Sequence, residues 1–76
     1  MPLTPAQCRT ARNVLSWTLD DLAHAAGISI FTVRDFEGAK RTPDRPTLVL
    51  MRRAFEGAGV KFCERSGDVR LAGSRG

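Results

Sequence analysis

The sequence contains few of the residues on which small enzymes, metalloproteins and disulfide-rich domains depend. Two cysteines and one histidine occur in 76 residues, and tyrosine is absent. Cys8 and Cys63 lie far apart, without a CxxC motif or a cluster of cysteine and histidine, so we expect two reduced thiols and neither a zinc site nor a disulfide framework. No motif joins a nucleophile to a base and an orienting group. We therefore expect a protein that is not an enzyme and has no catalytic residues, metal or cofactor.

Long apolar runs are also missing. None approaches the about 20 residues that a transmembrane helix needs, and the first ten residues, MPLTPAQCRT, lack the apolar core of a signal peptide. We therefore expect a cytoplasmic protein without a membrane partner. Positive charge is plentiful, because 12 Lys and Arg against 8 Asp and Glu give a net charge of +4. This balance favours nucleic acid as a polyanionic partner.

Four segments have the apolar periodicity of short helices, and each follows a residue that can cap the first backbone N–H groups. The predicted helices cover residues 5–15, 19–26, 30–37 and about 45–58, and the capping residues are Thr4, Thr18, Ser29 and Asp44. Gly27 supplies the left-handed backbone conformation that ends the second helix. In the first helix, Cys8 belongs to the apolar stripe, and we expect it to serve packing.

The period of the pattern changes after residue 59. Apolar residues then alternate with polar ones at Val60, Phe62, Val69 and Leu71, which predicts a β-hairpin or two short strands. The sequence thus predicts a mainly α fold, with a helical domain over residues 1–59 and a strand segment over residues 60–76 whose last five residues fray. Because so short a segment is unstable alone, we expect it to pair across a twofold axis or to fold onto the fourth helix.

The second and third predicted helices are joined by a turn of about three residues. With Ala23 in the first of them, Gly27 in the turn and Val33 in the second, they form a helix-turn-helix pattern. An ordinary pair of antiparallel helices is the alternative interpretation. The spacing of these three residues favours the helix-turn-helix.

Three parts of the sequence resemble the Xre/Cro family of phage and bacterial regulators. They are the segment LDDLAHAAGIS, the residues Val33, Phe36 and Glu37, and the segment KRTP at 40–43. The resemblance extends over about residues 4–58. It implies a four-helix Cro/repressor-like fold and a homodimeric transcriptional regulator, a repressor that binds an inverted repeat in double-stranded DNA and is associated with the bacterial nucleoid when bound.

The outward face of the third helix can be phased at about 100° per residue, independently of the resemblance. With Val33 inward, Phe31, Arg34 and Asp35 point away and Ile30 lies at the flank. Arginine can pair with guanine, and apolar groups can touch thymine methyls. The resemblance implies base-reading roles for the same four residues. Alternatively, Ile30 is half-buried packing and Phe31 belongs to a protein interface. Asp35 restrains Arg34, accepts a hydrogen bond from a cytosine, or is solvated.

Contacts to DNA phosphates are expected from residues that border this face, because cations and helix N-termini position proteins on the backbone. The candidates are Thr18, Lys40, Arg41 and Arg45. A solvated basic loop is the alternative. Leu19 stands where members of the family often have a glutamine that contacts phosphate, so that contact is absent.

Arg12 and Glu37 occupy positions where the family often has a salt bridge between the first and third helices. The resemblance implies that this pair fixes the angle of the reading helix, since a buried pair contributes orientation more than stability. Two unpaired surface charges are the alternative. Ala39 stands where the family usually has glycine, so the turn after the third helix can differ.

Dimerisation is expected because one helix-turn-helix buries little area on DNA. Val49 and Leu50 on the fourth helix and the tail strands are candidate contacts, although the core of a monomer could equally contain them. The rival hypothesis is a protein-interaction module, such as an antitoxin or accessory factor, that binds a protein through Phe31 or the tail.

Overall fold

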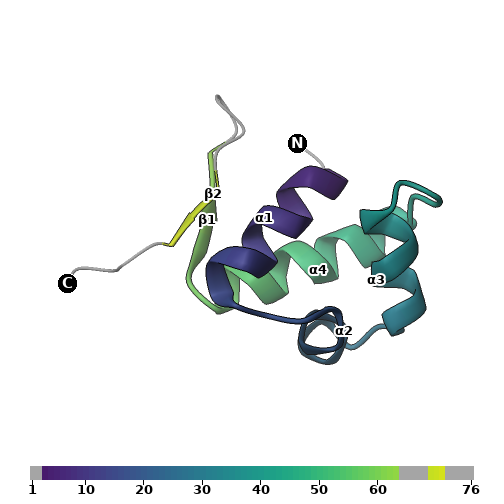
Figure 1. Ribbon diagram of the computed structural model, residues 1–76, viewed down its shortest axis with the longest axis horizontal. Coiled ribbons are helices and arrows are strands. Elements are labelled where there is room, and N and C mark those ends of the chain that lie inside the picture. The colour runs from purple at the N-terminus through teal and green to yellow at the C-terminus, as the bar shows by residue number, and fades with distance from the viewer. Residues whose placement is uncertain (1–2, 64–68, 72–76) are drawn as a thin grey trace.

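Four helices and a two-stranded antiparallel sheet make up the computed structural model, which describes residues 3–63 and 69–71 (Figure 1). The elements are α1 (Pro5–Leu15), α2 (Leu19–Ala26), α3 (Ile30–Glu37), α4 (Arg45–Gly57), β1 (Val60–Phe62) and β2 (Val69–Leu71). The predicted mainly α fold with a short C-terminal hairpin is confirmed. None of the helices in the described ranges has the length and apolar character needed to cross a membrane.

Each helix begins at the capping residue that the sequence predicts. The Thr4 hydroxyl accepts the Gln7 N–H at 3.1 Å, and the Gln7 side chain accepts the Thr4 N–H at 3.1 Å. Thr18 forms the same reciprocal pair with Asp21, and Ser29 and Asp44 accept N–H groups in the first turns of α3 and α4. These bonds satisfy N–H groups that have no partner within the helix.

The core lies between the helices: α2 packs against α3 and α4, and α1 packs against α3. Its largest fully buried side chains are Leu22, Val33, Phe36, Met51, Phe55 and Cys8. Cys8 and Ala11 are the buried residues of α1, so the predicted packing role of Cys8 is confirmed. Trp17, in the connection between α1 and α2, stacks on Phe55 with ring centroids 5.8 Å apart.

The C-terminal strands fold back onto helices. They pair in a register that sets Val60 opposite Leu71 and Phe62 opposite Val69. β1 contacts both α1 and α4, and β2 contacts α1. Val60 is buried, and the Phe62 ring meets Phe55 edge-on at 6.0 Å. The strands thus fold onto the fourth helix, as one of the two predicted arrangements has it, and also cover α1. The predicted frayed end, residues 72–76, lies outside the described residues.

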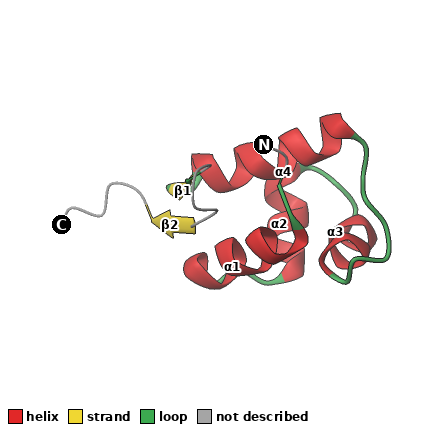
Figure 2. Ribbon diagram, turned by 90° about the horizontal axis from the view of Figure 1, so that it is seen from above, coloured by secondary structure: helices red, strands yellow, loops and turns green. Residues whose placement is uncertain are grey.

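The hairpin and α3 lie at opposite ends of the domain (Figure 2). Among the described elements, α3 has contacts with α1 and α2, on its inner side. The far position of the hairpin therefore leaves the outer face of α3 uncovered.

Candidate nucleic-acid interface

The turn between α2 and α3 is built from the three residues that the sequence singles out. Ala23 and Val33 are buried. Gly27 adopts φ 71°, in the left-handed region, and the following Ile28 N–H donates to the Ala23 carbonyl at 2.9 Å. A small residue at 23 and a left-handed residue at 27 thus allow α3 to begin only three residues after the turn glycine.

The outer face of α3 carries large side chains in solvent. Phe31 is 62% exposed and Ile30 37% exposed, and Arg34 is exposed as well. With 37% of its surface exposed, Ile30 both packs against the protein and reaches the outer face. The Arg34 guanidinium carbon lies 5.1 Å from the centroid of the Phe31 ring, a cation–π contact.

Asp35 lies closer to the protein than the phasing of the helix predicts. It is half-buried, because the loop after α3 folds back over it. Its carbonyl accepts the Lys40 N–H at 2.8 Å and the Arg41 N–H at 3.3 Å. The turn requires a left-handed residue, and Ala39 supplies it with φ 59°.

The inner end of α3 is attached to α1 by a cluster around Glu37, which is 7% exposed. Arg12 donates from Nε to Glu37 Oε2 at 2.6 Å and from Nη2 to Oε1 at 2.7 Å. Its remaining Nη1 donates to the Trp17 carbonyl at 2.9 Å. The expected ion pair is thus present as a two-pronged contact that also holds the connection between α1 and α2.

Two further donors complete the Glu37 cluster, and the sequence reasoning missed both. The Cys8 thiol donates to Glu37 Oε2 at 3.2 Å, and Arg9 Nη1 donates to the Glu37 carbonyl at 2.7 Å. Burial, followed by this hydrogen bond, raises the pKa of the Cys8 thiol well above its ordinary value, and the hydrogen bond to Glu37 raises the pKa of Arg12. The available signal was the spacing of Cys8, Arg9 and Arg12, which places them on one flank of a helix.

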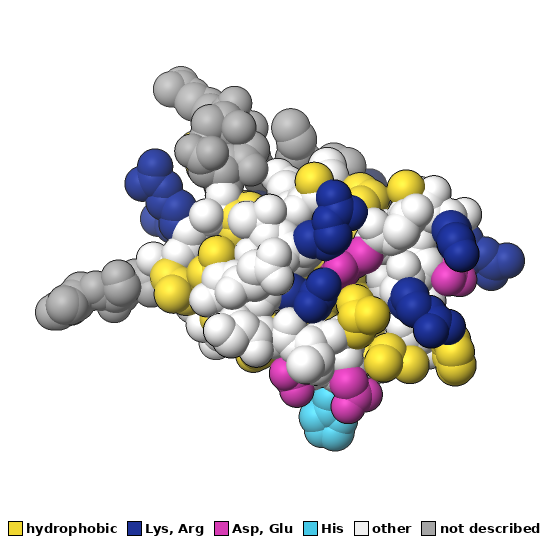
Figure 3. All heavy atoms as spheres, in the orientation of Figure 1, with side chains coloured by type: hydrophobic (Ala, Val, Ile, Leu, Met, Phe, Trp, Pro, Cys, Tyr) yellow, Lys and Arg dark blue, Asp and Glu magenta, His cyan; other side chains and the backbone are white. Residues whose placement is uncertain are grey.

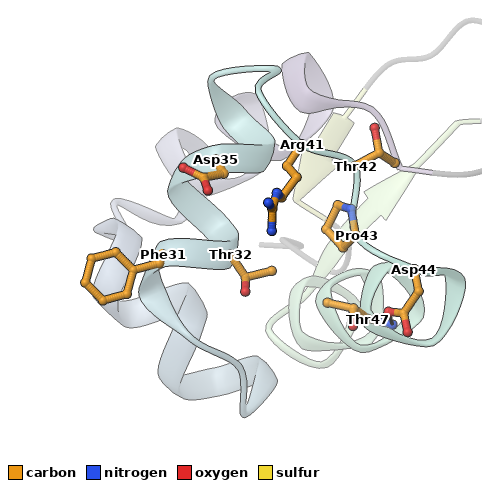
Figure 4. Close-up of a pocket in the computed structure, with 8 residues that line it drawn as sticks. All are labelled: Phe31, Thr32, Asp35, Arg41, Thr42, Pro43, Asp44 and Thr47. Carbon is orange, nitrogen blue, oxygen red and sulfur yellow. Dashed lines mark hydrogen bonds between the residues drawn. The ribbon is translucent and has the colours of Figure 1, made fainter.

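A hollow of about 380 Å³ opens beside the outer face of α3, between that helix and the start of α4. It is lined by Phe31, Thr32, Asp35, Arg41, Thr42, Pro43, Asp44 and Thr47. In Figure 4 the Arg41 side chain extends from the loop toward Thr32, across the hollow. The structure thus brings one predicted phosphate ligand, Arg41, beside two predicted base readers, Phe31 and Asp35.

The other predicted phosphate ligands come from three parts of the chain: the loop after α3, the start of α4 and the start of α2. Lys40 adjoins Arg41, Arg45 is the first residue of α4, and all three cations are exposed. Thr18 lies at the start of α2 and does not line the hollow. Its hydroxyl accepts the Asp21 N–H at 3.0 Å and keeps its own proton to donate.

Basic and apolar side chains gather over the end of the molecule that carries α3, with acidic atoms among them, as Figure 3 shows. Further acidic side chains lie beside the histidine on the neighbouring projection. No protein-family model matches the chain, and no curated protein is significantly similar to it. The resemblance to the Xre/Cro regulators therefore rests on the residues quoted above.

Proposed function

We propose that the protein is a cytoplasmic, sequence-specific regulator of transcription that binds double-stranded DNA with α3 in the major groove. The observation that carries this proposal is the contrast between the two sides of α3. Its outer face presents Phe31 and Arg34 to solvent, whereas its inner end is attached to α1 through Glu37. An α-helix with its side chains is about as wide as the major groove of B-DNA. The protein acts by binding, without a metal or cofactor.

The basic residues beyond α3 support this orientation. Arg41 reaches across the hollow at the edge of the reading face, with Lys40 before it and Arg45 at the start of α4. In the described part of the chain, none of these three side chains forms an ion pair or a side-chain hydrogen bond. Their charges are therefore available to DNA phosphates on either side of the groove.

The two kinds of contact predict different mutant signatures. Arg34→Ala should cost about 1–3 kcal/mol on the operator and flatten discrimination at one base position, with a smaller loss on random DNA. Arg41→Ala and Lys40→Ala should weaken binding to all sequences alike and reduce the salt slope by about one unit per lost phosphate contact. Each variant is titrated against the operator and a scrambled duplex across a salt series. Equal losses on both duplexes for Arg34→Ala would make Arg34 an anchor, and unchanged affinity in every variant would contradict the proposal.

We further propose a homodimeric repressor on an inverted repeat, with half-sites one helical turn apart. Val49 and Leu50 support this, because both are exposed apolar residues of the longest helix. The hairpin is a less suitable place to test it. Val60 is buried, so removing residues 60–76 would disturb the core as well as any interface.

A second candidate function is a protein-interaction module, such as an antitoxin or an accessory factor. The 62% exposure of the Phe31 ring favours it, because large exposed aromatic residues are enriched at protein interfaces. The salt series distinguishes the two functions, since binding to phosphates depends steeply on salt concentration.

A further inference from the structure

We infer that Phe31 and Arg34 read two neighbouring base pairs as one unit, a thymine beside a guanine. The inference rests on the proposed function, and it states which base step the reading helix selects. It arises from the contact between the two side chains and from their spacing on α3.

The Arg34 guanidinium lies over the Phe31 ring. The guanidinium carbon lies 5.1 Å from the ring centroid. Within residues 3–63 and 69–71, the Arg34 side chain forms neither an ion pair nor a hydrogen bond, not even with its neighbour Asp35. The guanidinium carries five N–H groups that point outward from its carbon, and a contact with an aromatic ring gives them no oxygen or nitrogen acceptor, so they can still donate to a base. The ring thus restrains Arg34, and no described residue accepts a hydrogen bond from its N–H groups.

The guanidinium donors match guanine better than any other base. Guanine presents the acceptors O6 and N7 side by side in the major groove, and arginine donates to both at once. The ring beside it is 62% exposed and carries no polar group. The apolar feature that a base offers in the major groove is the C5-methyl group of thymine.

The spacing of the two residues decides which base pair each one reaches. Three residues of α-helix advance about 4.5 Å along the axis, and successive bases on one strand are about 3.4 Å apart. For a helix that lies along the groove, this advance corresponds to adjacent base pairs more closely than to pairs two steps apart, which are about 6.8 Å apart. Phe31 therefore meets the base pair next to the guanine that Arg34 contacts.

The contact with the ring also lowers the cost of binding. A long arginine side chain loses rotamer freedom when it is fixed on a base, and the ring has already removed part of that freedom. Shortening Phe31 should therefore weaken the recognition of guanine by Arg34, although Phe31 does not touch the guanine. This coupling distinguishes a joint reader from two independent contacts.

The test begins with selection of bound sequences from a random duplex pool by the full chain, followed by single-atom changes in the selected duplex. We expect enriched sites to contain thymine beside guanine. Replacing that thymine by deoxyuridine removes only the methyl group and should weaken binding about fourfold, the effect of one buried methyl group. Replacing the guanine by 7-deazaguanine removes one of its two acceptors and should weaken binding about tenfold.

Two substitutions of the exposed Phe31 separate its roles without disturbing the core. Phe31→Leu keeps an apolar contact but removes the ring face, so the deoxyuridine effect should persist while the preference for guanine falls. Phe31→Ala should reduce both. Enriched sites without this step, an unchanged affinity for the deoxyuridine duplex, or an intact guanine preference in Phe31→Leu would overturn the inference and leave the proposed function standing. Failure to enrich any sequence would overturn both.

Discussion

Arg12→Ala is the substitution whose effect follows most directly from the structure. It removes three hydrogen bonds at once, two to the Glu37 carboxylate and one to the Trp17 carbonyl. The Glu37 side chain, which is 7% exposed in the unaltered protein, then keeps the Cys8 thiol as its side-chain donor. Because a charge without its partner is strongly disfavoured in such a site, the folded state must rearrange or lose stability.

The expected cost is large for a domain of this size. Removing one partner of a buried ion pair costs about 3–5 kcal/mol, and we expect the lower end because the Arg12 side chain is itself 16% exposed. A loss of about 3 kcal/mol corresponds to a fall in Tm of about 12–24 °C. Domains of this length have a total stability of about 4–11 kcal/mol, so unfolding is best followed by urea titration at low temperature.

The chain offers a matched control in Arg52, which pairs with Glu56 at 3.0 Å on the surface of α4. Arg52→Ala removes the same functional group from a half-exposed pair, together with its cation–π contact to Phe62, whose centroid lies 5.2 Å from the guanidinium carbon. We expect the loss of these exposed contacts to cost about 1–2 kcal/mol in total. If Arg12→Ala costs no more than Arg52→Ala, the Glu37 cluster does not hold α1 and α3 together as described.

A double variant separates stability from orientation. Replacing both charges, as in Arg12→Met with Glu37→Leu, leaves no unpaired charge and should recover most of the lost stability. The directional hydrogen bonds stay absent, so we expect discrimination between operator and scrambled DNA to remain reduced. A double variant that discriminates like the original chain would refute the role of the pair in fixing the reading helix.

Three further predictions concern the backbone, the buried thiol and the dimer. Ala39 has a positive φ, so Ala39→Gly should raise the free energy of unfolding by about 0.5–1 kcal/mol. Gly27→Ala should lower the free energy of unfolding by about 1 kcal/mol through backbone strain alone, because an added Cβ meets nothing within 4 Å. The pKa of Cys8 is raised by burial, so the contribution of this thiol to stability is complete below about pH 8.5. Above that pH the thiol ionises in the unfolded chain, and the free energy of unfolding falls by about 1.4 kcal/mol per pH unit. Urea unfolding from pH 8 to 10 should show this slope, and Cys8→Ala should remove the slope. Leu50→Glu should halve the mass measured by light scattering and weaken operator binding with little change in Tm, and an unchanged mass would exclude this face as the dimer contact.

Features determined by neighbouring residues were predictable from the sequence, and features determined by distant contacts were not. Thr4 and Ser29 cap helices through groups two or three residues away, so a local pattern predicts them. The hydrogen bonds of Cys8 and Arg9 join residues 29 and 28 positions apart, and they depend on how α1 packs against α3. Periodicity identifies Cys8 as inward-facing but does not reveal the carboxylate that it meets.

The loop after α3 shows the same division. The sequence indicates an altered turn at Ala39, because alanine replaces the usual glycine there. The partial burial of Asp35 and the return of the Lys40 and Arg41 N–H groups to its carbonyl depend on the path of the whole loop. Likewise, alternation predicts two strands after residue 59, whereas their contact with α1 as well as α4 is a property of the assembled helices.

The placement of the two thiols has a practical consequence for experiments on this protein. Cys8 is enclosed in the core, whereas Cys63 is exposed directly after β1, in the part of the molecule opposite α3 (Figure 1). Because thiol-reactive dyes attack the accessible thiolate, a maleimide fluorophore should attach selectively at Cys63 without substitution of Cys8. The unaltered sequence therefore provides its own site for anisotropy or single-molecule measurements, with the probe remote from the helix under study.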